Sequence, residues 1–325
     1  MNICFLDGND IPYTSKDVDT NKIRGAESIL INLSRELIKL GNNITICNNC
    51  INDCVIDGVK WLNIKKIDKE KNFDVAITNN DMRLFDNIRS KKYFAFSHSI
   101  QTLEKFIRKG QLFSYLKYKP KIILLGNYHA ENRNKLLKIF GSINIQWAVD
   151  EIFINSEIDD ALVEDRAIFT SRRDRNLDIL VEIWKDYIFK YNKNSRLFVT
   201  PSNLIDNNFN IFERNFSSRN LLINDLIKSR VFLVPGHKGE LFCLAAEEAR
   251  ELCIPIVTLG IGSLSERVIH GKTGFIAKNK NQFANYSLDI LKNDSIWREL
   301  RNNLLNLRGS KKWNEVAKQL LSKIQ

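Results

Sequence analysis

GHKGELFCLAAEEA, residues 236–249, is the stretch from which the fold and the site can be predicted. Its carboxylates Glu240 and Glu248 stand eight residues apart. We expect a helix over residues 241–252, with Glu240 at its N-terminus. Eight helical residues advance about 12 Å and return to within roughly 80° of the starting direction, so both side chains can reach one elongated ligand. Ionised carboxylates accept two donors at once, which suits the vicinal hydroxyls of a sugar or a ribose.

The chain continues with IPIVTLGIGSLSERV, residues 254–268, and GKTGF, residues 271–275. This pattern indicates a buried strand, a glycine-punctuated turn and a further strand. Taken alone, two glutamates at this spacing fit solvated positions on an amphipathic helix better than a ligand site.

Residues 236–275 as a whole resemble the C-terminal signature of family 4 glycosyltransferases of the GT-B fold, in which Glu, seven residues and a second Glu precede a small-residue turn and a T-G-F-like strand. The resemblance implies that Glu240 is catalytic and lies by the donor sugar, and that Glu248 holds the nucleotide ribose. The family usually reads E-P-F-G here, so Phe242 and Cys243 stand at donor-binding positions but depart from its pattern, which leaves the identity of the sugar open.

Short apolar strands alternate with amphipathic helices along the chain, which is typical of an α/β fold with mostly parallel sheets. In the first half we expect strands at Asn2–Leu6, Ile44–Cys47, Val75–Thr78, Tyr93–Phe96 and Lys121–Leu125. In the second half we expect them at Ala167–Thr170, Arg196–Thr200, Val231–Val234, Pro255–Leu259 and Gly274–Ala277. Besides 241–252, helices are expected at about 29–40, stopped by Gly41, and at 175–190, 281–293 and 312–324.

The length of 325 residues favours two domains over one. The text QWAVDEIFIN, residues 146–155, resembles the interdomain passage of the same family. The resemblance implies a GT-B architecture of two Rossmann-like domains facing a central cleft: residues 1–152 on the acceptor side, residues 153–309 binding the nucleotide sugar, and a C-terminal helix within 310–325 returning to the first domain.

A predicted diphosphate site lies in FTSRRDRNLDIL, residues 169–180, where arginines stand between a strand and a helix start. The resemblance assigns Arg175 to the diphosphate as a catalytic and donor-binding residue and Arg172 as the next ligand, with Arg173 exposed; solvated helix-start charges are the alternative. Gly262 and Ser263 lie in the glycine-rich turn, whose amides can form an anion nest, although a plain strand-to-helix turn is also compatible.

Two further candidates lie in the first half. Gly25, in the loop NKIRGAES of residues 21–28, precedes a helix and resembles the family's phosphate-side glycine loop, although Arg24 replaces a second glycine there. His98 follows an apolar strand in AFSHS, at the edge where open α/β sheets bind ligands. The family often has a catalytic histidine there near the transferred sugar; a packed or solvated histidine is the alternative. We do not expect His98 to be a general base, since the leaving phosphate of a retaining, front-face transfer can take the acceptor proton.

No cofactor is expected apart from the nucleotide sugar as co-substrate. No persuasive D-x-D motif is present, and arginines can supply the positive charge, so we expect that no metal is required. Cys47, Cys50 and Cys54 lie close in sequence, but no second pair follows at zinc-site spacing, which favours reduced, mostly buried thiols.

The formal net charge of +11 is concentrated between Arg83 and Lys138, where thirteen Lys or Arg stand against three acidic residues. Such a surface suits an anionic acceptor, the acidic face of a membrane or nucleic acid, or it has no partner at all. No nucleic-acid recognition motif is present. No apolar run of about 18 residues and no signal-peptide pattern is present, so we expect a cytoplasmic protein, with the inner face of a membrane as the second location.

The predicted activity is a retaining transfer of a hexose or related sugar from UDP, GDP or another nucleotide to a glycan or lipid-linked acceptor, in polysaccharide or glycoconjugate biosynthesis. A catalytically silent GT-B homologue that binds a glycan or organises an assembly is the first alternative. A nucleic-acid binder built on the basic segment is the second.

Overall fold

The structure, a computed structural model, describes residues 1–18, 23, 25–215 and 218–325. It divides into two compact units: unit 1, made of Met1–Ala148 and Trp313–Gln325, and unit 2, made of Val149–Lys312. Each unit is a Rossmann-like arrangement of a mainly parallel sheet and helices, which confirms the predicted fold class. Arg24, part of the loop that resembles the family, lies outside the described residues.

Unit 1 contains an eight-stranded sheet of order β3-β4-β2-β1-β5-β6-β7-β8. Its strands are β1 (Asn2–Asp7), β2 (Asn43–Asn48), β3 (Cys54–Ile56), β4 (Val59–Asn63), β5 (Asn72–Asn79), β6 (Arg89–Phe96), β7 (Lys121–Leu124) and β8 (Ser142–Asn144). Every pair is parallel except β3–β4, a hairpin whose two-residue turn is Asp57–Gly58, with φ of 54° and 76°. All strands expected in this half are present, whereas β3, β4 and β8 were not predicted.

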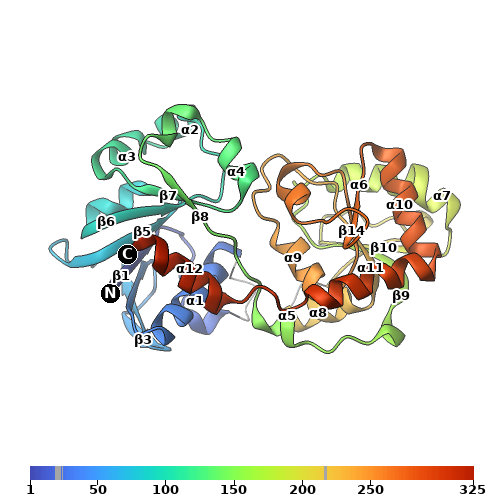
Figure 1. Cartoon of the computed structure of the whole chain (residues 1–325), viewed down its shortest axis with the longest axis horizontal. Coiled ribbons are helices and arrows are strands. Elements are labelled where there is room, and N and C mark those ends of the chain that lie inside the picture. Colours follow the sequence, from blue (N-terminus) through green and yellow to red (C-terminus); the bar gives the residue numbers. More distant parts are fainter. Residues whose placement is uncertain (19–22, 24, 216–217) are drawn as a thin grey trace. The chain divides into compact units, whose positions relative to one another are not determined.

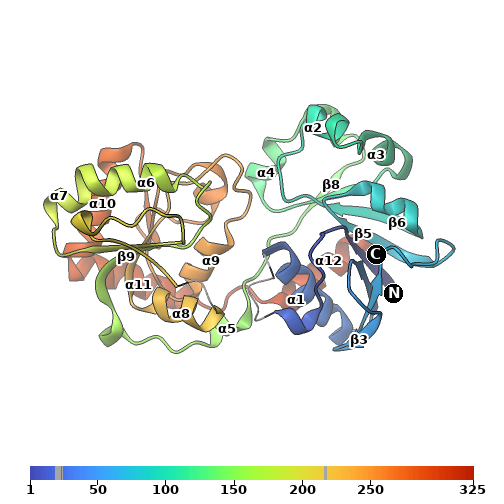
Figure 2. The same ribbon diagram turned by 180° about the vertical axis from the view of Figure 1, so that it is seen from behind.

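Helices cover both faces of the unit 1 sheet, with α1 and α12 on one side and α2 and α3 on the other (Figures 1 and 2). The helices are α1 (Gly25–Lys39), α2 (Leu103–Arg108), α3 (Leu112–Tyr118), α4 (Asn127–Glu131) and α12 (Trp313–Ile324), with single 3-10 turns η1 (Ser15–Asp17), η2 (Met82–Asn87) and η3 (Lys135–Lys138). The last helix is anchored in this unit because Trp313 stacks on Trp147 at 6.1 Å and Asn314 donates to Glu36 at 3.2 Å.

Unit 2 contains a six-stranded parallel sheet of order β11-β10-β9-β12-β13-β14. Its strands are β9 (Glu164–Phe169), β10 (Arg196–Val199), β11 (Ile211–Glu213), β12 (Ser229–Leu233), β13 (Ile256–Thr258) and β14 (Gly274–Ile276). The strands expected from the sequence are all present; the edge strand β11 was missed. Helices α6 and α10 cover one face, and α8 and α9 the other (Figures 1 and 2).

The helices of unit 2 are α5 (Glu151–Asn155), α6 (Leu177–Ile183), η5 (Trp184–Ile188, a π turn), α7 (Phe189–Tyr191), α8 (Arg219–Ile227), α9 (Leu244–Glu251), α10 (Lys280–Lys292) and α11 (Asp294–Leu307), with 3-10 turns η4 (Asp160–Leu162), η6 (Asn207–Phe209) and η7 (Gly262–Glu266). The helix predicted over 175–190 is thus one run interrupted by a π turn. Within the described residues, every helix is too short or too polar to cross a bilayer.

Candidate active site

Glu240 lies in the turn between β12 and α9, where its carboxylate is held from two sides. Its Oε2 is 3.5 Å from Nε of Arg175, and its Oε1 accepts a hydrogen bond from the amide of Cys243 at 3.2 Å. The Glu240 and Arg175 side chains are each 19% exposed. Burial raises the pKa of Glu240, and the charge of Arg175 and the Cys243 amide oppose that rise. Arg175 and Glu240, two predicted site residues that lie 65 positions apart in the sequence, are therefore in contact within unit 2.

The helix begins later than expected, so the eight-residue helical spacing predicted for Glu240 and Glu248 is wrong. Helix α9 begins at Leu244, and the preceding Cys243 has a left-handed backbone with φ of 59°, which ends helical geometry on that side. Glu248 lies on α9, but Glu240 belongs to the turn. The distance between the two carboxylates is therefore set by the turn and not by eight helical residues.

His237 joins Arg175 to the same turn and was not predicted. Its Nδ1 is 3.0 Å from Nη1 of Arg175 and accepts from the amide of Gly239 at 2.9 Å. A guanidinium has only donors, so Nδ1 must be the acceptor in both bonds, and the ring proton of the neutral form is on Nε2. A Cβ on Gly239 would lie 3.0 Å from Arg175 Nη1, so this close approach favours glycine.

The neighbouring arginines lie differently. Asn176, with a left-handed φ of 66°, donates from its side chain to the Gly236 carbonyl oxygen at 2.5 Å and fixes the arginine segment to the turn. Arg172 is exposed and pairs with Asp174 at 2.8 Å, yet its charge also lowers the pKa of Glu240. Arg173 donates to the Ser202 carbonyl oxygen at 2.8 Å and is half exposed.

The turn of Gly262 and Ser263 packs against the Glu240 loop. The Ser263 amide donates to the Glu240 carbonyl oxygen at 2.9 Å, so the predicted anion nest is wrong for this amide, because its one proton is already used. Gly262 has φ of 76°, and a Cβ there would lie 2.4 Å from the His237 oxygen and 2.8 Å from the Glu240 oxygen. The structural role of both residues is to position the Glu240 loop.

Gly262→Ala tests this packing against a matched glycine. Gly271 also has φ of 76°, but nothing lies within 4 Å of a Cβ built there. Backbone strain is common to the two substitutions, so we expect Gly262→Ala to lower the free energy of unfolding by about 1–3 kcal/mol more than Gly271→Ala, through overpacking alone. Urea denaturation of both variants measures the difference. Equal losses would show that the glycine turn does not press on the Glu240 loop.

Glu248 lies in the second turn of α9, close to several charged side chains. Burial raises its pKa to about 7, with Arg219 and Arg214 opposing the rise and Asp150 adding to it. Arg219 pairs with Asp150 at 2.5 Å, and Arg214 is held near this carboxylate. Among the described residues, the Glu248 carboxylate makes no hydrogen bond or ion pair, which leaves its oxygens available to hydroxyl donors.

The raised pKa of Glu248 predicts how stability depends on pH. The carboxyl of an unfolded chain has a pKa near 4.5 and that of Glu248 in the folded chain about 7, so the folded state binds the proton more tightly. This contribution is fully present below about pH 4.5 and is lost as the pH rises through 7. We therefore expect Glu248→Gln to melt roughly 2–6 °C above the wild type near pH 8 and level with it near pH 4.5, in calorimetric scans. Parallel melting curves across this range would contradict the assignment.

Phe242 and Cys243 do not offer side chains to a ligand. The Phe242 ring is 4% exposed and lies under the Arg267 guanidinium, 4.7 Å from its central carbon. The Cys243 side chain is 2% exposed, and burial raises the pKa of its thiol well above 9.0. The predicted donor contact through these side chains is therefore not available; Cys243 contributes its amide to Glu240 instead.

The remaining two predicted residues belong to unit 1. His98 follows β6; its amide donates to Asn80 Oδ1 at 2.8 Å, and within the described residues its buried Nε2 has no partner. Burial lowers the pKa of His98 to about 4, so the ring is neutral at physiological pH. Gly25 is the first residue of α1 and is half-buried.

Among the described residues, no three His, Cys, Asp or Glu side chains are arranged to hold a metal ion, and Cys47 lies with its Sγ 3.5 Å from that of Cys4.

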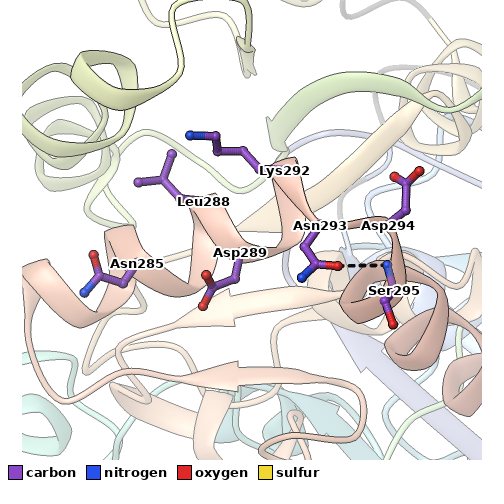
Figure 3. A pocket seen from close by; sticks show the side chains of 7 residues that line it. All are labelled: Asn285, Leu288, Asp289, Lys292, Asn293, Asp294 and Ser295. Atoms are coloured by element: carbon purple, nitrogen blue, oxygen red, sulfur yellow. Dashed lines mark hydrogen bonds between the residues drawn. The ribbon is translucent and has the colours of Figure 1, made fainter.

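A surface hollow of about 780 Å³ at the α10–α11 junction is lined by Asn285, Leu288, Asp289, Lys292, Asn293, Asp294 and Ser295 (Figure 3). There Asn293 accepts from the Ser295 amide at 2.9 Å as the N-cap of α11, so its polar group serves the helix, and no predicted site residue lines the hollow.

Comparison with known proteins gives a match to a family model over part of the chain. Residues 206–306 match the family model of glycosyl transferases group 1, a range that includes Glu240, Glu248 and Gly262. A comparison with curated proteins gives no match.

Solved structures of GT-B glycosyltransferases share the fold. A sucrose-phosphate synthase from Thermosynechococcus elongatus is 14% identical, with a TM-score of 0.71 over 99% of this chain and 98% of that one. HepE from Anabaena, in complex with UDP and glucose, is 12% identical, with a TM-score of 0.70 over 100% and 99%. TarM from S. aureus, in complex with Fondaparinux, alpha-GlcNAc-glycerol and UDP, is 15% identical with a TM-score of 0.60; 77% of this chain aligns with 55% of TarM, so the chain spans about half of that protein.

Proposed function

We propose that the protein is a retaining glycosyltransferase that transfers a hexose or related sugar from a nucleoside diphosphate to a glycan or lipid-linked acceptor in polysaccharide or glycoconjugate biosynthesis. The observation that carries the proposal is the contact of Arg175 with Glu240 in unit 2, since Glu240 lies within the segment that matches the group 1 family model. Similar solved structures in complex with UDP and sugars support the donor class.

The chemistry follows from where charge develops. As the bond between the anomeric carbon and the β-phosphate oxygen breaks, negative charge builds on the diphosphate, and fixed cations there lower the barrier. In the proposal Arg175 faces the diphosphate, with Arg172 beside it, and Glu240 accepts hydrogen bonds from the donor sugar. The acceptor oxygen forms its bond on the same face, and the leaving phosphate oxygen takes its proton.

The other assignments are parts of the same proposal. Glu248 accepts the ribose hydroxyls, since its oxygens have no fixed donor among the described residues. We also assign His98 and Gly25 to donor binding, and in this assignment His98 donates or accepts hydrogen bonds without acting as a general base. The arginines supply the positive charge that a divalent ion supplies elsewhere, so we propose transfer without a metal. The basic segment of residues 83–138 meets an anionic partner, a charged acceptor or a membrane face.

A silent homologue that binds a glycan is the second candidate, because the family's Pro and Gly after the first Glu are replaced by Leu241 and Cys243. The two candidates differ in turnover. Incubation with UDP- and GDP-sugars in the presence of EDTA, followed by NMR of the released sugar, measures slow transfer to water and its stereochemistry. We expect release of one nucleoside diphosphate with retention at the anomeric carbon; binding without release would favour the silent homologue.

A further inference from the structure

Three short helices of unit 1, α2, α3 and η3, form one layer with a common buried side. The Phe106 ring meets Tyr115 edge-on at 5.4 Å between centroids, and the Tyr115 hydroxyl donates to the Leu137 carbonyl oxygen at 2.8 Å. All three side chains are at most 5% exposed. Helices α2 and α3 lie side by side in both views (Figures 1 and 2). Residues 103–139 are called the α2–η3 segment below.

Large apolar side chains of the α2–η3 segment are turned away from that buried side. The exposed ones are Ile107 (59%), Phe113 (73%), Leu116 (49%), Leu136 (64%) and Ile139 (61%). Phe113 and Leu116 stand three residues apart on α3, so they share one helix face. These five are among thirteen exposed large apolar side chains in the described part of the chain, so the exposure is concentrated in this segment.

Basic side chains are interleaved with the apolar ones. The exposed basic residues of the segment are Arg108, Lys109, Lys117, Lys119, Lys121, Lys135 and Lys138. Arg108 pairs with Glu104 at 3.9 Å and Lys117 with Asp86 at 2.6 Å, whereas the other five have no ion pair among the described residues. The segment therefore presents uncompensated positive charge next to exposed apolar groups.

A hollow at the turn between α2 and α3 has the charged lining expected of a phosphate-binding site. It encloses about 510 Å³ and is lined by Asn80, Asp81, Arg83, Arg108, Lys109, Gly110 and Gln111. Three cations line it against the single carboxylate of Asp81, which pairs with Arg83 at 2.7 Å. A lipid phosphate entering this hollow would meet positive charge beside Ile107.

We propose that the α2–η3 segment docks the protein on a bilayer that contains anionic lipids, with Phe113 and Leu116 entering the boundary between headgroups and acyl chains. Charge alone would suit a soluble polyanionic acceptor equally well. The apolar side chains decide between the two, because a water-soluble glycan chain would leave them in water whereas a bilayer buries them. The inference extends the partner named in the proposed function, but it does not depend on catalysis, because vesicle binding needs no donor.

Flotation with two kinds of vesicle tests the proposal: phosphatidylcholine alone, and phosphatidylcholine with phosphatidylglycerol. We expect the full chain to float with the anionic vesicles only and to be released by salt. The double variant Phe113→Ser with Leu116→Ser should bind about tenfold or more weakly, because each side chain loses its burial. The matched control is the double variant Ile51→Ser with Val55→Ser. Val55 lies on β3, at the opposite edge of the sheet, and Ile51 lies just before that strand; they are 67% and 76% exposed. We expect this control to bind as the wild type.

A second readout does not depend on the double variant. All five native tryptophans are at most 4% exposed, so the indole of Leu116→Trp can be followed separately, and brominated lipid should quench it. Failure of the wild type to float with anionic vesicles would overturn the proposal. So would binding of the double variant at wild-type strength, or an unquenched indole, since either result means that charge alone acts and that the apolar side chains do not enter the bilayer.

Discussion

We expect Glu240→Gln to lower kcat for sugar transfer by about 10²–10³-fold while the fold stays intact. The carboxylate is the group that we assign to the donor sugar, and the amide keeps its size but loses one charge and half of its accepting capacity. Folding should tolerate the change because burial already raises the pKa of Glu240, and the Gln oxygen can still accept from the Cys243 amide. Kinetics of nucleotide release, compared with the melting temperature of the same sample, separate an effect on turnover from an effect on stability.

The control for this prediction is Glu182→Gln. Glu182 belongs to the same unit, is 49% exposed and pairs with Lys280 at 2.5 Å. Exposed pairs contribute about 0–1 kcal/mol, so turnover and stability should remain near the wild type. If Glu240→Gln turned over like Glu182→Gln, the carboxylate would have no part in transfer.

Arg175→Ala should lower kcat/KM by about 10³-fold, because it removes the cation that we place at the departing diphosphate. It also removes the charge that lowers the pKa of Glu240, so the pH at which activity falls on the acid side should move upward. Arg175→Lys keeps the charge but not the planar donor fork that meets both Glu240 and His237, and we expect an intermediate loss. Initial rates across a pH series measure both changes.

Arg173→Ala is the matched control, since Arg173 lies two residues away, is 51% exposed and donates to the Ser202 carbonyl oxygen. We expect kcat/KM within a factor of about two of the wild type for this variant, as for an ordinary surface substitution. Equal losses in Arg173→Ala and Arg175→Ala would mean that general positive charge, not the contact with Glu240, determines the rate.

Much of the fold could be predicted because its central strands are long apolar runs. Strands β1, β2 and β5 each carry enough buried residues to separate them from helices. The three-residue strands β3, β8 and β11 contain too few residues to show a period. Strands β13 and β14 are as short, but the apolar run of residues 254–259 and the T-G-F motif marked them. The hairpin that joins β3 to β4 did carry a usable signal, since Asp-Gly between two short runs favours a tight turn.

The site could be predicted only in part. Arg175 and Glu240 could be found because motif resemblance names both positions. His237 could not, because its role depends on a contact with Arg175, 62 residues away in sequence. The left-handed Cys243 and the engaged amide of Ser263 follow from the packing of two loops, which no local pattern encodes.

Thermal unfolding with a panel of UDP- and GDP-sugars, for the wild type and Arg175→Ala, tests most directly whether unit 2 binds a nucleoside diphosphate sugar through Glu240 and Arg175. A ligand at about 100 times its dissociation constant stabilises the folded state by about 2.7 kcal/mol, equivalent to a rise in Tm of roughly 5–10 °C. We predict such a rise for at least one nucleotide sugar with the wild type and little or none with Arg175→Ala. No rise with any of them, or the same rise in both proteins, would contradict the account.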